Sequence, residues 1–364
     1  MAKRVGVDKW IFFTTLLLVV VGLAMVFSAS AVVAQERYHS PYAFVGRQAG
    51  WALAGILFMV FLMSVDYTRY NSPRFIYPAL AITTVLLVMV FFFRDSHNTH
   101  RWIRFGGFFT FQPSEIAKPV VILFLAWFLH TRLDSMHDWK HTLLRAAMMP
   151  ALFIILVVRQ PDLGTALVLA GVTAMMLVLA GMEWKYLAAG IAVALPPLAV
   201  LLFGVAWRRQ RMLVFLHPDS DPMGAGFHIN QSLIAVGTGG LMGRGFMEGM
   251  QKLFYLPEAS TDFIFANIAE ELGFIGAMSI VVLFVVLGVR GLRTAYRVQD
   301  PFGRLIAFGI TTAILLQAFF NISVVLSLLP TKGIPLPFIS SGGTSLFFTL
   351  AGIGILLNIS KKVD

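Results

Sequence analysis

The sequence predicts an all-α membrane protein with ten transmembrane helices. The chain has 364 residues, of which 58% are hydrophobic and only 13% are charged. Its hydrophobic residues gather in blocks about twenty residues long, which is the length that a helix needs to cross a bilayer. Most Lys and Arg residues lie in the short segments between these blocks. We therefore expect residues 1–364 to form one polytopic membrane domain.

The apolar blocks follow one another along the whole chain. The first block, 10–34, comes after a basic pair, as in a signal peptide, but it is longer than the apolar core of a signal peptide and further blocks follow. We expect it to be retained as the first helix. The other helices are predicted at 44–64, 75–93, 114–130, 143–158, 164–181, 186–206, 263–289, 305–329 and 343–359.

The positive charges predict how the helices are oriented. If the N-terminus is cytoplasmic, the inner segments hold fifteen Lys and Arg residues and the short outer loops hold six. Cytoplasmic loops carry the excess of positive charge in membrane proteins. Both termini are therefore predicted to be cytoplasmic, with two longer stretches outside, 94–113 and about 207–262. The second stretch, between helices 7 and 8, contains enough apolar residues to be ordered against the membrane or the helix ends.

Composition also excludes several classes of function. A net charge of +10 does not indicate nucleic-acid binding here, because positive residues between apolar blocks set topology and attract anionic lipid. The absence of cysteine excludes disulfides, thiol nucleophiles and Cys-based metal sites. The sequence has no Walker, GxSxG or HExxH motif, so it shows no apparatus for ATP hydrolysis, serine hydrolysis or zinc proteolysis.

Charged residues occur inside or at the edge of the apolar blocks. Arg47 begins the second block, and Glu115 and Lys118 are spaced i, i+3 in the fourth, so they can neutralise one another on one helix face. Ionisable groups at membrane depth are functional by default, although a buried ion pair that only holds helices together is the alternative. We expect Arg47, Glu115 and Lys118 to line a water-filled cavity open to the outer face. Asp162 begins the sixth block and either faces Arg47 or caps its own helix.

Asp262 stands at the outer start of the eighth block, in the stretch LPEASTDFIFANIAEELGFIG. It can serve as a helix cap, but Glu258 precedes it, and Glu270 and Glu271 follow about 12 Å further along the same helix. That second pair is either structural or functional. A carboxylate beside basic residues on one membrane face suits general-base chemistry on an anionic substrate.

The stretch PTKGIPLPFISSGGTSL, residues 330–346, precedes the last helix. Its three prolines and paired glycines cannot form a regular span. Irregular backbone at membrane depth is tolerated where protein buries it or a cavity hydrates it. Lys332 is therefore either a solvated loop charge or the partner of an anion.

Four stretches resemble a known family. The SEDS (shape, elongation, division and sporulation) family of peptidoglycan glycosyltransferases has motifs similar to WIRFGGFFTFQPSEIAK, GFHINQSLIAVGTGGLMGRGF, LPEASTDFIFANIAEELGFIG and PTKGIPLPFISSGGTSL, in this order and over almost the whole chain. The PTKG and PEASTDF stretches resemble the division branch more than the elongation branch. Two positions depart from the pattern, Ser341 where an aromatic residue is common and Ser260 where histidine is usual.

The resemblance implies a reaction and a role for Asp262. Members of the family polymerise lipid II into β-1,4 glycan strands at the outer face of the bacterial cytoplasmic membrane, and the division branch does so for the septal wall. The family's essential aspartate falls on Asp262, which would act as general base toward the 4-hydroxyl of the acceptor GlcNAc. That oxygen would attack C1 of the donor MurNAc with inversion, and undecaprenyl pyrophosphate would leave.

The resemblance also implies binding residues and partners. Cations would stabilise the leaving pyrophosphate, and Glu115 would hold Lys118 in position. The expected substrate-binding residues are Arg47, Arg104, Glu115, Lys118, Asp162, Gln231, Glu258 and Lys332. A divalent cation, Mg²⁺ or Mn²⁺, is a candidate cofactor with unknown ligands, and no organic cofactor is expected. The expected partners are lipid II, the growing glycan strand, a class B penicillin-binding protein, other division proteins and membrane lipid, but no nucleic acid.

Two other functions stay open from the sequence. A lipid II flippase would also need a polar cavity, but its charged residues would have to be reachable from each side of the membrane in turn. A scaffold that only recruits a transpeptidase would not need Asp262.

Overall fold

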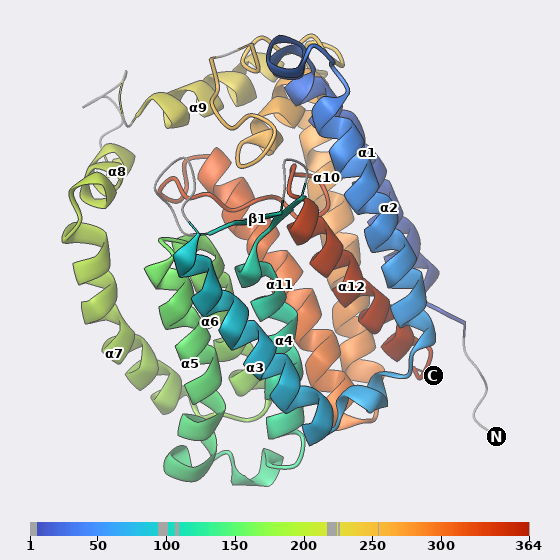
Figure 1. Ribbon diagram of the computed structural model, residues 1–364, viewed down its shortest axis with the longest axis vertical. Coiled ribbons are helices and arrows are strands. Elements are labelled where there is room, and N and C mark those ends of the chain that lie inside the picture. Colours follow the sequence, from blue (N-terminus) through green and yellow to red (C-terminus); the bar gives the residue numbers. More distant parts are fainter. Residues whose placement is uncertain are drawn as a thin grey trace.

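Every predicted apolar block forms a helix in the computed structural model, which describes residues 6–93, 101–105, 109–216, 224, 226–253 and 255–363 (Figure 1). These helices are α1 (Lys9–Tyr38), α2 (Ala43–Ser64), α3 (Pro73–Met89), α4 (Pro113–Leu129), α5 (Leu144–Arg159), α6 (Leu163–Leu179), α7 (Trp184–Phe203), α10 (Ile264–Arg297), α11 (Pro301–Val325) and α12 (Gly343–Ser360). Within this part of the chain, eight helices are long and apolar enough to cross a membrane. α4 and α6 have 17 residues each. The helical membrane fold is confirmed, while the length criterion is met by eight helices and not by ten.

The stretches predicted to lie outside carry the other regular elements. β1 (Ile103–Phe105) and β2 (Phe109–Phe111) pair as an antiparallel hairpin. The long loop after α7 contains α8 (Ala206–Leu216) and α9 (Phe227–Gly239). Short turns complete the described chain, namely 3₁₀ turns at Tyr67–Tyr70, Val90–Phe92 and Leu133–Ser135 and a π turn at Trp139–Leu143. The long loop therefore has regular structure in its described part.

The start of α1 and the end of α12 lie at the same end of the helix bundle (Figure 1). The Asp8 N–H donates a hydrogen bond to Ser360 Oγ at 3.1 Å, and Arg290 Nη2 donates to Asp8 Oδ2 at 2.6 Å. Asp8 also caps α1, because its side chain accepts hydrogen bonds from the N–H groups of Trp10 and Ile11. These contacts fix the start of α1, the end of α12 and the last turns of α10 together.

α11 covers a different range from the predicted block 305–329. It begins at Pro301, because Asp300 accepts hydrogen bonds from the Phe302 and Gly303 N–H groups and so caps the helix. It ends at Val325, and soon afterwards Ser327 adopts a left-handed conformation with φ +55°. The predicted block is thus displaced by one helical turn.

Burial separates the central helices from the peripheral ones. In α11 and α12, 72% and 78% of the apolar stretch is buried inside the protein, whereas no residue of α7 is buried. Figure 1 shows α7 at the edge of the bundle, well separated from α12. The exposed apolar side chains of α7 suit a lipid-facing helix, while α11 can bury polar side chains that find partners in neighbouring segments.

A break in α10 receives part of the long loop. Gly273 lies within α10 with φ +67°, a conformation that favours glycine. Beside it, the Phe274 N–H donates to Gly240 O at 2.8 Å, and the Arg244 N–H donates to Glu270 O at 3.0 Å. A Cβ atom at residue 273 would lie 2.2 Å from a backbone nitrogen of the loop. The loop and the broken helix are therefore interlocked through their main chains.

The carboxylates of Glu270 and Glu271 complete this attachment. Glu270 accepts a hydrogen bond from the Met250 N–H at 2.9 Å, and Glu271 accepts one from the Met247 N–H at 2.9 Å. Glu271 also forms a buried ion pair with Lys252 at 2.6 Å. These contacts support the structural interpretation of the second carboxylate pair.

Candidate functional site

Asp262 lies in the turn that leads into α10. Because α10 runs from this turn to the end of the bundle where Arg290 binds Asp8, Asp262 and the start of α1 lie at opposite ends. A cavity of about 300 Å³ adjoins Asp262, and we call it the aspartate cavity. Its lining includes Arg211, His228, Glu258, Asp262, Thr331 and Lys332. Two carboxylates, two cations and an imidazole thus meet at one place.

The backbone that carries Asp262 is held by donors from three other segments. We call residues 259–262 the aspartate segment. Its four carbonyls each accept a hydrogen bond, in order from Asn267 Nδ2 at 2.8 Å, Ser341 N at 2.9 Å, Ser340 Oγ at 2.6 Å and Asn321 Nδ2 at 2.8 Å. This part of the chain is neither helix nor strand, so side chains and a loop N–H supply the partners that regular structure would otherwise give.

Gly333 leaves the carboxylate of Asp262 accessible from one side. A Cβ atom on this glycine would lie 2.9 Å from Asp262 Oδ2, which is closer than ordinary contact. A residue with a side chain would therefore press against the carboxylate or displace it. The sequence PTKG places a residue without a side chain where the carboxylate oxygen needs open space.

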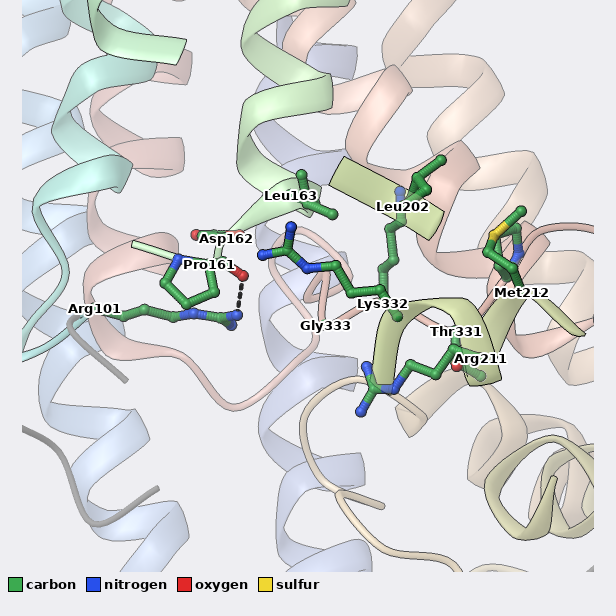
Figure 2. Close-up of a pocket in the computed structure, with 13 residues that line it drawn as sticks. Arg101, Pro161, Asp162, Leu163, Leu202, Arg211, Met212, Thr331, Lys332 and Gly333 are labelled. Atoms are coloured by element: carbon green, nitrogen blue, oxygen red, sulfur yellow. Dashed lines mark hydrogen bonds between the residues drawn. The ribbon is translucent and has the colours of Figure 1, made fainter. Parts of the chain in front are cut away.

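Positive charge gathers beside Asp262. A second, smaller cavity of about 50 Å³ shares Arg211 and Lys332 with the aspartate cavity and adds Arg101 and Arg208. Figure 2 shows Arg101 on the side of Asp162, and Arg211 on the opposite side with Met212. Arg101 is held by hydrogen bonds to Gln160 O, at 3.1 Å, and to Pro161 O. The arrangement suits an anion with several charged oxygens.

The environment changes the proton affinity of two of these groups. Burial, together with the nearby carboxylate of Glu258, raises the pKa of Asp262 to about 7, while Arg101 and Arg211 act in the opposite direction. Burial and the neighbouring Arg208 lower the pKa of Lys332. A carboxylate with a pKa near neutral pH is suited to accept a proton during catalysis.

A larger cavity of about 510 Å³ also borders the aspartate segment. We call it the tryptophan cavity, because Trp51 and Trp102 line it, together with Arg37, Arg47, Gln48, Lys252, Ser260 and Ser341. Glu258 lines both this cavity and the aspartate cavity. The two positions that depart from the family pattern are neighbours here, because the Ser341 N–H donates to Ser260 O at 2.9 Å. Arg47 therefore lies at a cavity adjacent to Asp262, with its guanidinium over the Phe44 ring at 5.4 Å.

Glu115 and Lys118 form the ion pair that their spacing predicts. Lys118 Nζ lies 2.7 Å from Glu115 Oε2 and donates to Gln317 Oε1, also at 2.7 Å. Gln317 in turn donates to Pro335 O at 2.9 Å. The pair lines a separate cavity of about 40 Å³, so it reaches the 330–342 loop through Gln317 and does not line the aspartate cavity.

Asp162 caps α6, as one of its two interpretations predicts. Its Oδ1 accepts a hydrogen bond from the Thr165 N–H at 3.1 Å. Its Oδ2 accepts hydrogen bonds from Gln112 Nε2 at 3.0 Å and Ser114 Oγ at 3.3 Å, which ties α6 to the start of α4. Asp162 also lines the small cavity beside Arg101 (Figure 2), whereas Arg47 lies in the tryptophan cavity.

The other expected binding residues are spread around this region. Glu258 accepts a hydrogen bond from Thr261 Oγ1 at 2.8 Å and separates the two large cavities. Gln231 lies on α9, one turn after His228, and does not line the aspartate cavity. Arg104 is the central residue of β1, opposite Thr110, and its side chain lies outside the described part of the structure.

Sequence reasoning missed four ionisable residues that line the aspartate cavity or its small neighbour, namely Arg208, Arg211, His228 and Arg101. The basic run WRRQR directly after the seventh apolar block was a signal for the first two, since such a run at an outer helix end is unusual under the positive-inside rule. No local pattern marks His228.

Comparisons with known proteins identify the family of the chain. The family model FTSW_RODA_SPOVE, described as "Cell cycle protein", matches residues 8–364. "Probable peptidoglycan glycosyltransferase FtsW" from Geobacter metallireducens is 41% identical over 359 residues, which cover 98% of this chain and 95% of that protein. "Stage V sporulation protein E" from Bacillus subtilis is 40% identical over 365 residues, which cover 99% and 98%.

The fold also has a solved counterpart. A chain in "Structural coordination of polymerization and crosslinking by a peptidoglycan synthase complex" superposes with a TM-score of 0.80 and 28% sequence identity over 97% of both chains. The match of the family over residues 8–364, with relatives 40% and 41% identical along almost their whole length, shows that the chain belongs to the FtsW, RodA and SpoVE family of cell cycle proteins.

Proposed function

We propose that this chain is a peptidoglycan glycosyltransferase of septal wall synthesis, which polymerises lipid II at the outer face of the bacterial cytoplasmic membrane. The observation that carries the proposal is the position of Asp262, with its pKa of about 7, next to a cavity lined by cations. The names of the relatives support the reaction class. The geometry supports the assignment of roles within the site.

The proposed orientation rests on the charge distribution and on the contact between the start of α1 and the end of α12. The excess of Lys and Arg in the inner segments supports ten spans with both termini in the cytoplasm. Because the start of α1 and the end of α12 are joined through Asp8 and Ser360, an even number of spans fits the structure. Asp262 then faces the outside, where lipid II presents its sugars.

In this reaction Asp262 accepts one proton. The 4-hydroxyl of the acceptor GlcNAc gives its proton to the carboxylate, and its oxygen forms a bond to C1 of the donor MurNAc. The bond between C1 and the pyrophosphate oxygen breaks on the opposite face, so that undecaprenyl pyrophosphate leaves with the electron pair. An α-linked donor thereby becomes a β-1,4 linkage in a single displacement, as with inverting glycosidases.

The cations beside Asp262 suit the leaving group. Arg101, Arg208, Arg211 and Lys332 come from three places in the chain and line the aspartate cavity or its small neighbour. Fixed positive charge in a poorly solvated cavity stabilises the charge that develops on a leaving pyrophosphate. Leu202 and Met212 line the same place (Figure 2), so the cavity combines cations with apolar surface, as a lipid-linked pyrophosphate requires.

The tryptophan cavity suits the second saccharide. Trp51 and Trp102 offer aromatic faces, and Gln48, Ser260 and Ser341 offer polar atoms. Aromatic surface with a few polar groups is typical of small-ligand sites. Because Glu258 borders both large cavities, two sugar units held in them would meet beside the aspartate segment.

The residues present do not fit a divalent cation held by protein side chains alone. Within the described residues, no group of three or more His, Asp or Glu side chains could hold a metal ion. The surroundings of Asp262 are dominated by Arg and Lys. We assign no step to a metal, and the assay below compares rates with and without Mg²⁺ and Mn²⁺.

The proposed partner is a class B penicillin-binding protein, together with other division proteins. The solved chain of similar fold is part of a peptidoglycan synthase complex, which supports an assembly of this kind.

The proposal is tested by reconstitution with labelled lipid II and the transpeptidase partner. Wild-type protein should form glycan strands, and Asp262→Asn should lower the rate about a hundredfold or more, as expected for loss of a general base. Asp262→Asn at nearly the wild-type rate would remove Asp262 from the mechanism. Wild-type protein that forms no strand, but moves lipid II between leaflets, would favour the flippase.

A further inference from the structure

Asn321 joins the aspartate segment to the loop that carries Lys332. This residue lies on α11 and is 1% exposed. Its Nδ2 donates to Asp262 O at 2.8 Å and to Ile334 O at 2.7 Å. An amide nitrogen has two hydrogens, so both donors of Asn321 are used. One side chain therefore sets the backbone of Asp262 relative to a residue two positions from Lys332.

Ser340 holds the preceding peptide unit in the same manner. It is 4% exposed, its Oγ donates to Thr261 O at 2.6 Å, and it accepts a hydrogen bond from the Leu336 N–H at 2.7 Å. The carbonyls of Thr261 and Asp262 belong to the two planar peptide units on either side of the Asp262 α-carbon. When both planes are fixed, the direction of the Asp262 Cα–Cβ bond is fixed as well.

Burying a polar side chain such as Asn321 costs free energy, which indicates that its hydrogen bonds serve the structure of the site. Asn321 lies within an apolar helix, where an apolar side chain would pack without needing partners. Its Oδ1 has no hydrogen-bond partner among the described residues, so the amide is kept for its two donors. Its partners are the main chain next to Asp262 and the main chain next to Lys332.

We propose that Asn321 and Ser340 are positioning residues, which aim the Asp262 carboxylate and, through Ile334, set its place relative to Lys332. This inference rests on the proposed function, because it assumes that Asp262 is the base. Neither residue contacts the aspartate cavity, so neither contributes to substrate binding directly. A displacement of about 1 Å at a reacting group costs up to about a hundredfold in rate.

The first test is steady-state kinetics of Asn321→Leu in the lipid II assay. We expect kcat to fall by about tenfold to a hundredfold, with the KM for lipid II within about twofold of wild type. The matched control is Thr311→Val, which changes another fully buried polar residue of α11 whose hydroxyl bonds only within its helix, to Ala307 O at 2.7 Å. The control should keep kcat within about twofold.

A second readout separates positioning from general destabilisation. When rates are normalised to the folded fraction at each pH, a loss of folded protein leaves the pH profile unchanged, whereas a displaced carboxylate titrates in a different electrostatic environment. The midpoint of the kcat–pH profile should therefore move in Asn321→Leu and stay unchanged in Thr311→Val. If Asn321→Leu does not fold, Ser340→Ala, the smaller change, must show the same fall in kcat and the same displaced midpoint.

The outcomes distinguish this inference from the proposed function. If Asp262→Asn is inactive while folded Asn321→Leu and Ser340→Ala both keep wild-type kcat and pH profile, the positioning role is wrong and the general base stands. If kcat falls but the pH midpoint stays unchanged, the residues act only on stability and the positioning role is also wrong. If Asp262→Asn retains full activity, the proposed mechanism fails first.

Discussion

Two groups of carboxylates lie within ten residues of each other around the start of α10, and their surroundings differ. Glu270 and Glu271 are fully buried and accept hydrogen bonds from the loop backbone and, for Glu271, from Lys252. The carboxylate of Asp262 receives no hydrogen bond from any described residue and faces a cavity with cations. Carboxylates that already accept hydrogen bonds and form an ion pair hold the structure together. A carboxylate that accepts none and faces a cavity with cations remains available to take a proton.

The largest effect in this comparison is expected at Lys252. Lys252→Met would leave Glu271 as a buried charge without its cation, which costs about 3–5 kcal/mol of folding stability. Thermal or denaturant unfolding in detergent measures this loss. The double variant Lys252→Met with Glu271→Leu should recover part of the stability. An unchanged unfolding transition in Lys252→Met would contradict the structural role of Glu271, and with it the difference between this carboxylate and Asp262.

The next effect is the pH dependence of the reaction. Since Asp262 must be ionised to accept a proton and its pKa is raised to about 7, the rate should rise about tenfold between pH 6 and pH 8. Folding stability should change in the opposite direction, because a raised pKa favours the protonated folded state and this contribution is lost as pH rises through about 7. Initial rates of strand formation across this range test it. A rate independent of pH down to pH 5 would contradict the assignment of the base.

A smaller effect is expected from the cations. Arg211→Gln should raise the KM for lipid II by about tenfold, because a charge-assisted hydrogen bond to pyrophosphate is lost. Arg209→Gln on the same helix is the matched control, since Arg209 is exposed and does not line either cavity beside Asp262. Equal KM values for the two variants would remove Arg211 from the substrate site.

The smallest effect concerns which side of the membrane a labelling reagent can reach positions 47 and 293 from. The control variant, Arg293→Cys, should keep nearly wild-type activity. The chain has no cysteine, so Arg47→Cys and Arg293→Cys can be labelled without background. Arg47 borders the tryptophan cavity and should react only with reagent added outside, whereas the exposed Arg293 near the end of α10 should react only from the cytoplasmic side. Labelling of position 47 from both sides would favour a transport cycle.

The fold was predictable because the membrane imposes a simple requirement on the sequence. Each apolar block became a helix, and the i, i+3 spacing of Glu115 and Lys118 gave their ion pair. The true start of α11 could also have been predicted from the sequence, because Asp300 followed by Pro301 is a typical helix start. Local patterns of this kind concern neighbours along one helix.

The candidate site was less predictable because it depends on contacts between distant segments. Asp262 was indicated by its sequence position and by resemblance. No local sequence pattern predicts that it lies near Arg211, which comes from α8, or near Lys332, which comes from the loop before α12. The sequence did contain an indication of buried polar contacts at Asn321 and Gln317, because both are polar amides within an apolar block. Their role as donors to the 330–342 loop appears only when α11 and that loop are seen together.

The glycine at position 333 has a consequence for inhibition. At this residue a single added carbon would already lie 2.9 Å from the Oδ2 of Asp262. A small group of a ligand that occupied the space left by the missing side chain would therefore lie within hydrogen-bond distance of that oxygen. An inhibitor could use this space with a protruding group that is small and donates a hydrogen bond.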